Sequence, residues 1–123
     1  MKTTILLLVS DPVVRLVLQE TLEQAGYTVL ATADLGQAVD RLKEIAPDLL
    51  IIRSYVDGLP GYDAAVYLRS KCVKMKVLFV GGLLDDDRLQ VRAGLQGFAV
   101  FPKPYSAAEL LEKVKEVLMQ PRG

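Results

Sequence analysis

The chain has 123 residues, with 15 Lys and Arg balanced by 15 Asp and Glu, one cysteine and no histidine. This length suits one domain with a real core, and the neutral balance gives no basic field that would bind nucleic acid. A single cysteine excludes an intrachain disulfide, and the lack of histidine argues against zinc sites and Ser-His-Asp catalysis. The apolar run at residues 5–9 is too short for a signal peptide or a membrane span, so we expect a cytoplasmic protein that makes no membrane contact.

Short apolar segments alternate with longer amphipathic segments along the whole chain. The expected strands are Ile5–Val9, Tyr27–Thr32, Leu49–Ile52, Val77–Val80 and Phe98–Phe101. Most of them lack polar alternation, which is typical of parallel strands covered by helices on both faces. We therefore predict an α/β, flavodoxin-like doubly wound fold, with a five-stranded parallel sheet of order 2-1-3-4-5 and five helices. One domain is expected over residues 1–120, followed by a tail at 121–123.

Capping residues mark where the helices between these strands begin and end. The first helix is expected to begin at Asp11-Pro12 and to end at Gly26. An amphipathic second helix is expected over 35–46, between Asp34 and Pro47. The three acids 85–87 are expected to cap the fourth helix and supply its first turn, and the capping box Ser106-Ala107-Ala108-Glu109 is expected to begin the fifth. Asp57-Gly58 is expected to form a turn in the loop after the third strand. Each predicted helix is thus bounded by its own sequence signal or by a neighbouring strand.

Ligands of doubly wound sheets bind beyond the carboxyl ends of the strands, near the topological switch point. In this chain that end carries Ser10, Asp11, Arg53, Ser54, Gly81, Gly82, Lys103, Pro104 and Tyr105. We therefore expect any functional site to lie among these residues.

Several segments together resemble the receiver domain of bacterial response regulators over nearly the whole chain. They are Val9-Ser10-Asp11, residues 47–52, Leu59-Pro60-Gly61-Tyr62-Asp63, Ala93-Gly94 and Lys103-Pro104-Tyr105. The resemblance implies an acidic pair after the first strand and an aspartate ending the third strand, which hold Mg²⁺ and accept a phosphoryl group from a histidine kinase. It also implies a hydroxyl residue after the fourth strand and a Lys-Pro pair after the fifth, which sense the phosphoryl oxygens. Asp11 matches one acid of the pair, and Lys103 matches the lysine.

The chain departs from this pattern at three site positions. Ser10 replaces the other acid, Arg53 replaces the phosphoacceptor aspartate, and Gly81 replaces the hydroxyl residue. The loop from Arg53 to Pro60 is also roughly three residues longer than the family spacing. Because arginine stays protonated and phosphoryl transfer needs a carboxylate, we expect no catalytic residue, no enzyme activity and no cofactor or Mg²⁺, with Asp11 as the residual metal candidate.

Three interpretations of Arg53 remain open. Its guanidinium could pair with Asp11 and occupy the space of a metal. It could instead turn away into solvent. In the third interpretation, Arg53 and Lys103 bind a phosphate-like anion together with backbone amides near Ser10 and Gly81.

The function that we favour from the sequence is a pseudo-receiver, a phosphorylation-independent interaction module. Its expected partners are signalling proteins such as a histidine kinase or an output protein, or a second copy of the chain, and nucleic acid and membranes are not expected. The predicted partner face consists of Leu89, Val91, Phe98, Phe101 and Tyr105. One alternative is a receiver that accepts the phosphoryl group on a substitute residue, Asp57 or Ser54. Another is a flavodoxin-like protein that binds an anion or a nucleotide, although no glycine-rich loop follows the first strand.

Overall fold

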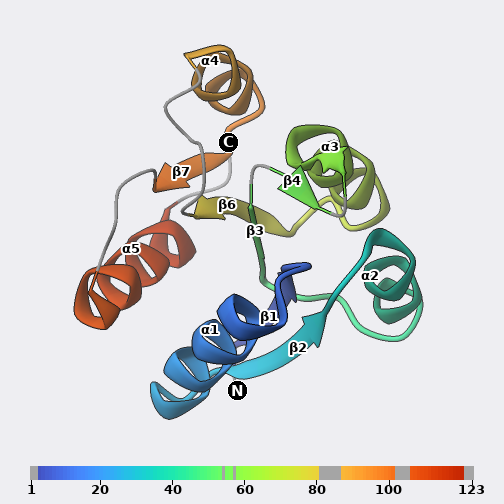
Figure 1. Cartoon of the computed structure of the whole chain (residues 1–123). Helices are drawn as coiled ribbons and strands as arrows, with labels where there is room; N and C mark the ends of the chain where they lie inside the picture. Colours follow the sequence, from blue (N-terminus) through green and yellow to red (C-terminus); the bar gives the residue numbers. More distant parts are fainter. Residues whose placement is uncertain (1–2, 54, 57, 81–86, 102–105, 121–123) are drawn as a thin grey trace.

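The runs of Ile, Leu and Val form one parallel sheet in the computed structural model of the chain (Figure 1). Its strands are β1 (Thr4–Leu8), β2 (Thr28–Thr32), β3 (Leu49–Ile52), β6 (Lys76–Val80) and β7 (Ala99–Phe101). They are ordered β2-β1-β3-β6-β7, which confirms the predicted flavodoxin-like arrangement. The structure describes residues 3–53, 55–56, 58–80, 87–101 and 106–120, without the side chains of 87–90.

Helices cover both faces of this sheet, as the continuous apolar strands require. They are α1 (Pro12–Gln24), α2 (Leu35–Leu42), α3 (Gly61–Lys71), α4 (Asp87–Leu95) and α5 (Ala107–Met119). Figure 1 shows α1 and α5 together on one side of the sheet and α2 and α3 on the other. Within the described part of the chain, no helix is both long enough and apolar enough to span a membrane.

Successive side chains of each central strand enter opposite cores because strand side chains alternate between the two faces. In β3, Leu50 and Ile52 pack into the core beneath α2 and α3. Leu49 and Ile51 pack into the core beneath α1 and α5. The sheet is therefore buried on both faces, and its polar chemistry is confined to the strand ends and loops.

The predicted caps are confirmed at both ends of α1 and at the start of α5. Asp11 Oδ1 accepts the backbone N–H groups of Val13 at 2.9 Å and Val14 at 3.2 Å. Gly26, with φ of +99°, follows α1 in a conformation that glycine adopts readily. At α5, Ser106 Oγ accepts from the Glu109 N–H, and Glu109 Oε1 accepts from the Ser106 N–H, both at 3.2 Å.

The second helix ends earlier than predicted. Its last residue is Leu42, whereas the apolar spacing predicted a helix up to Ala46. The N–H groups of Lys43 and Glu44 donate to the carbonyls three residues earlier, at 3.3 and 3.1 Å. Such tight turns close the helix before Pro47, whose ring keeps the residue before it out of helical geometry.

The extra residues after β3 form a small hairpin that the sequence did not predict. Its strands are β4 (Tyr55–Val56) and β5 (Leu59–Pro60), paired antiparallel with Val56 opposite Leu59. The predicted turn is confirmed at Gly58, which has a φ of +84°, while Asp57 lies outside the described residues. Val56 is fully buried in the core beneath α3, so the hairpin is anchored to the domain.

Candidate functional site

The carboxyl ends of β1 and β3 meet at the topological switch point of the sheet. Leu8 is paired with Ile52 at the last register position of these two strands. The chain that leaves β1 therefore starts beside Arg53, which follows β3. β1 lies between β2 and β3, so the strand order reverses direction at β1. Ligands of open α/β sheets bind at the carboxyl ends of the strands where the order reverses.

The first carboxylate after β1 belongs to the third residue beyond the strand. β1 ends at Leu8, one residue earlier than predicted, and is followed by the buried Val9 and the exposed Ser10. Asp11 comes next, and the backbone N–H groups of α1 donate to its Oδ1. Its contacts are those of a helix N-cap, the structural role predicted for it.

The Arg53 side chain is half-buried and makes no hydrogen bond or ion pair to any other residue that the structure describes. The interpretation in which Arg53 pairs with Asp11 is therefore wrong for this structure, which leaves the other two interpretations open. The physical reason is the position of Asp11, three residues beyond β1, where its carboxylate caps α1. The ion pairs of the described residues join neighbouring turns of the chain: Arg41 to Glu44, Lys43 to Asp40 and Lys113 to Glu116.

Arg15 is a residue of this end that the sequence analysis missed. Its Nη1 donates to the carbonyls of Val9 at 2.9 Å and Ser10 at 3.3 Å. A guanidinium from the first turns of α1 is thereby fixed over the end of β1. The available signal was a basic residue on α1 one turn after the cap, next to the apolar positions Val14 and Leu18.

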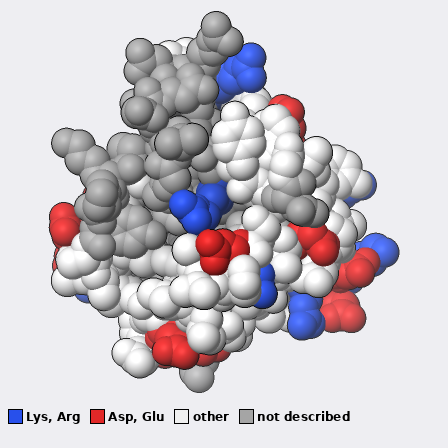
Figure 2. Space-filling model, in the orientation of Figure 1, with Lys and Arg blue, Asp and Glu red and all other residues white. Residues whose placement is uncertain are grey.

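Basic and acidic atoms lie next to one another near the middle of the face drawn in Figure 2, beside atoms that are not described. The other predicted site residues, Ser54, Asp57, Gly81, Gly82, Lys103, Pro104 and Tyr105, lie outside the described residues. The described site residues at the carboxyl end of β1 and β3 are therefore Ser10, Asp11 and Arg53, with Arg15 added.

Comparison with known proteins identifies the family. The family model described as response regulator receiver domain matches residues 5–115. The chain belongs to the receiver domain family. Such domains interact with histidine kinases and output domains in two-component systems.

Known proteins match most or nearly all of this chain. The probable C4-dicarboxylate response regulator DctR of Priestia megaterium is 34% identical over 98% of this chain and 52% of its own length. Sporulation initiation phosphotransferase F of Bacillus subtilis is 24% identical over 85% of each chain. The non-phosphorylated HemR receiver domain from Leptospira biflexa superposes with a TM-score of 0.87 at 25% identity, covering 99% of this chain and 98% of that one. The chain spans about half the length of DctR.

The described part of this receiver domain does not fit the Mg²⁺ ion that the family implies. Magnesium prefers octahedral oxygen ligation, usually with one or two carboxylates. The residues that follow β1 and β3 are Val9, Ser10 and Arg53, and Asp11 serves as a cap. Among the described residues, no group of three or more His, Cys, Asp or Glu side chains is placed to hold a metal.

The predicted partner face of the receiver domain requires one correction. Phe98 is only 5% exposed, and its ring packs against Phe79 at 6.1 Å and Tyr62 at 6.3 Å between ring centroids. The Arg69 guanidinium covers the ring at 5.9 Å. Phe98 immediately precedes β7 and is inserted toward α3, so it is a core residue and cannot contact a partner.

The remaining described residues of that face are accessible. Val91 of α4 is 63% exposed, and Phe101 is half-buried at the end of β7. The Leu89 side chain and Tyr105 lie outside the described residues. The predicted face is thus reduced to one α4 side chain and one β7 side chain in the described part.

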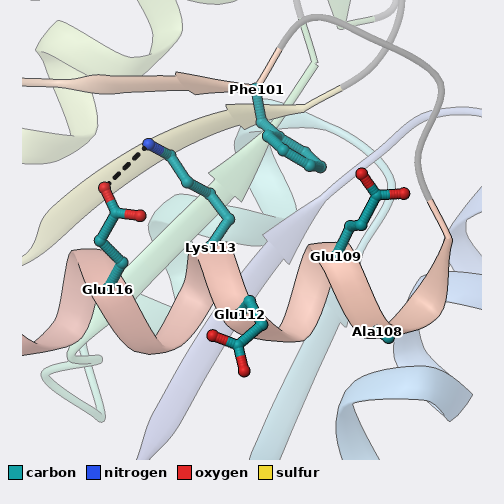
Figure 3. A pocket seen from close by; sticks show the side chains of 6 residues that line it. All are labelled: Phe101, Ala108, Glu109, Glu112, Lys113 and Glu116. Carbon is teal, nitrogen blue, oxygen red and sulfur yellow. Dashed lines mark hydrogen bonds and ion pairs between the residues drawn. The ribbon is translucent and has the colours of Figure 1, made fainter.

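Phe101 also lines an open cavity of about 330 Å³ between β7 and α5. The other lining residues, all from α5, are Ala108, Glu109, Glu112, Lys113 and Glu116. In Figure 3 the Phe101 ring lies above α5 with Lys113 on one side and Glu109 on the other, while Glu112 points away. Lys113 pairs with Glu116 at 3.3 Å. This surface combines an aromatic ring with a predominantly acidic border.

Proposed function

We propose that this receiver domain is a protein-interaction module of two-component signalling whose output does not depend on phosphorylation. The observation that carries the proposal is Arg53, which follows β3 where the family has its phosphoacceptor aspartate. An acyl phosphate forms on a carboxylate, and a guanidinium that stays protonated offers no comparable nucleophile. The proposed partners are signalling proteins, namely a histidine kinase or an output protein, or a second copy of the chain.

Electrostatics at the carboxyl end of the sheet support the same conclusion. A permanent positive charge opposes a nearby cation by about 4 kcal/mol per unit charge at roughly 4 Å and an effective dielectric near 20. Both Arg53 and Arg15 belong to this end, and the nearby Asp11 carboxylate caps α1. A divalent cation would therefore bind here much more weakly than at a site built from carboxylates.

The β7–α5 surface is the docking site that we propose for the partner. It combines the half-buried Phe101 with an acidic border formed by Glu109 and by Glu116, which pairs with Lys113. Such a surface favours a partner segment that presents an apolar side chain next to basic residues. Val91 is a second exposed apolar side chain of the predicted partner face, on α4.

The decisive experiment is to record amide NMR spectra of the domain with and without Mg²⁺ plus beryllium fluoride, a phosphoryl mimic. We expect no shifts beyond the ends of β1 and β3, because no carboxylate stands at position 53 to form the adduct. Shifts that spread from β1, β3 and β7 into α4 would show a working switch and overturn the proposal.

A second measurement follows the mass of the protein after incubation with a small phosphodonor such as acetyl phosphate. We expect no added phosphoryl group on the wild-type chain, and none that is stable on Arg53→Asp, since Ser10 and Gly81 still lack the groups of the family site. A phosphorylated wild-type product would instead favour a substitute acceptor, Asp57 or Ser54, which peptide mapping would distinguish.

A further inference from the structure

Two guanidinium groups belong to the carboxyl end of β1 and β3. The Arg15 guanidinium is held at the carbonyls of Val9 and Ser10, at 2.9 and 3.3 Å. Arg53 follows Ile52, which is paired with Leu8, so the backbone of Arg53 lies beside that of Val9. The residue that anchors Arg15 is therefore also the strand neighbour of Arg53.

Arg53 and Arg15 belong to the same face of the sheet. Leu49 and Ile51 pack into the core beneath α1 and α5, and Val9 belongs to that core as well. Continuing the alternation by one residue directs Arg53 to this face. Arg15 lies on α1, which covers the same face.

Both guanidinium groups retain hydrogen-bond donors. Arginine carries five N–H donors, and Arg15 uses Nη1 for its two carbonyl contacts. Within the described part of the chain, neither Nη2 nor Nε of Arg15 donates a hydrogen bond, and no side-chain nitrogen of Arg53 does so. Two permanent positive charges at one strand end repel each other, and an anion between them removes that repulsion.

We propose that Arg53 and Arg15 bind a tetrahedral oxyanion of the phosphate type, noncovalently, at the carboxyl end of β1 and β3. The planar fork of each guanidinium matches two oxygens of such an anion. The same chemistry is offered by inorganic phosphate and by a phosphorylated side chain of a partner. This inference goes beyond the proposed docking function, because it concerns a reversible ligand that leaves the mass of the protein unchanged.

The test is an NMR titration of the whole chain with potassium phosphate, matched in ionic strength by potassium chloride, which follows backbone amides and arginine Nε–H signals. We expect saturable shifts at Val9, Ser10, Arg15 and Arg53 with phosphate alone. Arg53→Gln should weaken phosphate binding at least about tenfold, because a charge-assisted bidentate contact is lost. Arg53→Lys, which keeps the charge without the fork, should give an intermediate loss and remains informative if the glutamine variant does not fold.

Arg41→Gln is the matched control, because Arg41 is an exposed arginine on α2 that pairs with Glu44 at 3.9 Å. It should leave phosphate binding unchanged. Shifts that follow ionic strength alone, or equal affinity in Arg53→Gln, would overturn the proposal. A titration with phenyl phosphate identifies the source of the ligand. If phenyl phosphate binds at least as tightly as inorganic phosphate, the ligand is a phosphorylated side chain. If it binds more weakly, the ligand is the free anion.

Discussion

The two ends of the parallel sheet use their charged residues differently. At the amino end, Asp48 Oδ2 accepts the Thr4 N–H at 2.9 Å, which joins β3 to β1. Lys76 Nζ donates to the Leu118 carbonyl at 3.0 Å and also to the Gln120 carbonyl, which joins β6 to the end of α5. At the carboxyl end, Arg53 has no such contact to a described residue. Charges at the amino end connect elements, as Arg15 does at the carboxyl end, whereas the Arg53 side chain retains its donors.

Phenylalanines at opposite ends of β7 show the same contrast. Phe98, just before the strand, is buried among rings from α3 and β6, whereas Phe101, at its end, is half-buried beside an open cavity. The comparison suggests that the amino end holds the fold together and the carboxyl end is available for ligands, as in other open α/β sheets. Each of the following substitutions tests one side of that division.

The largest expected effect comes from Phe98→Ala. Removing a buried aromatic side chain leaves a cavity and should lower the free energy of unfolding by about 3 kcal/mol or more. Phe101→Ala is the matched control and should cost only about 1 kcal/mol, because less of its ring is removed from water. Urea unfolding measures the free energy of unfolding of both variants. A similar decrease in the two would contradict the assignment of Phe98 to the core.

Asp11→Ala should lower the free energy of unfolding by about 1 kcal/mol, since two backbone N–H groups of α1 lose their acceptor. Asp11→Asn should retain most of the stability, because asparagine caps helices about as well as aspartate. Thermal unfolding followed by circular dichroism compares the two. If the asparagine variant loses as much as the alanine variant, the charge of Asp11 matters more than its capping role.

Lys76→Met should lower the free energy of unfolding by roughly 0.5–1 kcal/mol. The substitution keeps much of the apolar stem but removes the ammonium that binds the carbonyls at the end of α5. Hydrogen exchange should show faster opening of the last turn of α5. Lys74→Met, at a nearby exposed position, serves as the control, and equal exchange in both variants would refute the connection between β6 and α5.

The smallest effect is expected for Arg53→Gln, which should change the free energy of unfolding by less than about 0.5 kcal/mol, as surface substitutions without special contacts do. Chemical denaturation provides the measurement. A loss above about 1.5 kcal/mol would mean that Arg53 does connect structural elements, and the division between the two ends of the sheet would fail.

Much of the fold could be predicted because local signals agree with the overall packing. The apolar runs of β1 and β3 predicted buried parallel strands, and Asp11, Gly26 and Ser106 act at helix ends as predicted. The end of α2 was missed because Ile45 and Ala46 continue the apolar spacing, while turns before Pro47 close the helix. Tertiary context therefore overrode periodicity there.

The candidate site could be predicted only in outline. Sequence spacing correctly placed Ser10, Asp11 and Arg53 at one end of the sheet, because parallel strands align their carboxyl ends. It did not indicate which side chains touch, so pairing of Arg53 with Asp11 was only one of three open interpretations, and the contacts of Arg15 were missed. Side-chain contacts depend on where a strand ends to within one residue, which apolar patterning does not fix.

The β4–β5 hairpin offers a spectroscopic handle on the carboxyl end of the sheet. The chain contains no tryptophan, and Tyr55 is 60% exposed on this hairpin, close after Arg53 in the sequence. Tyr55→Trp would therefore install the single tryptophan of the chain on an element that Val56 anchors to the domain. Its fluorescence emission would report the binding of a ligand near the end of β3 without isotope labelling.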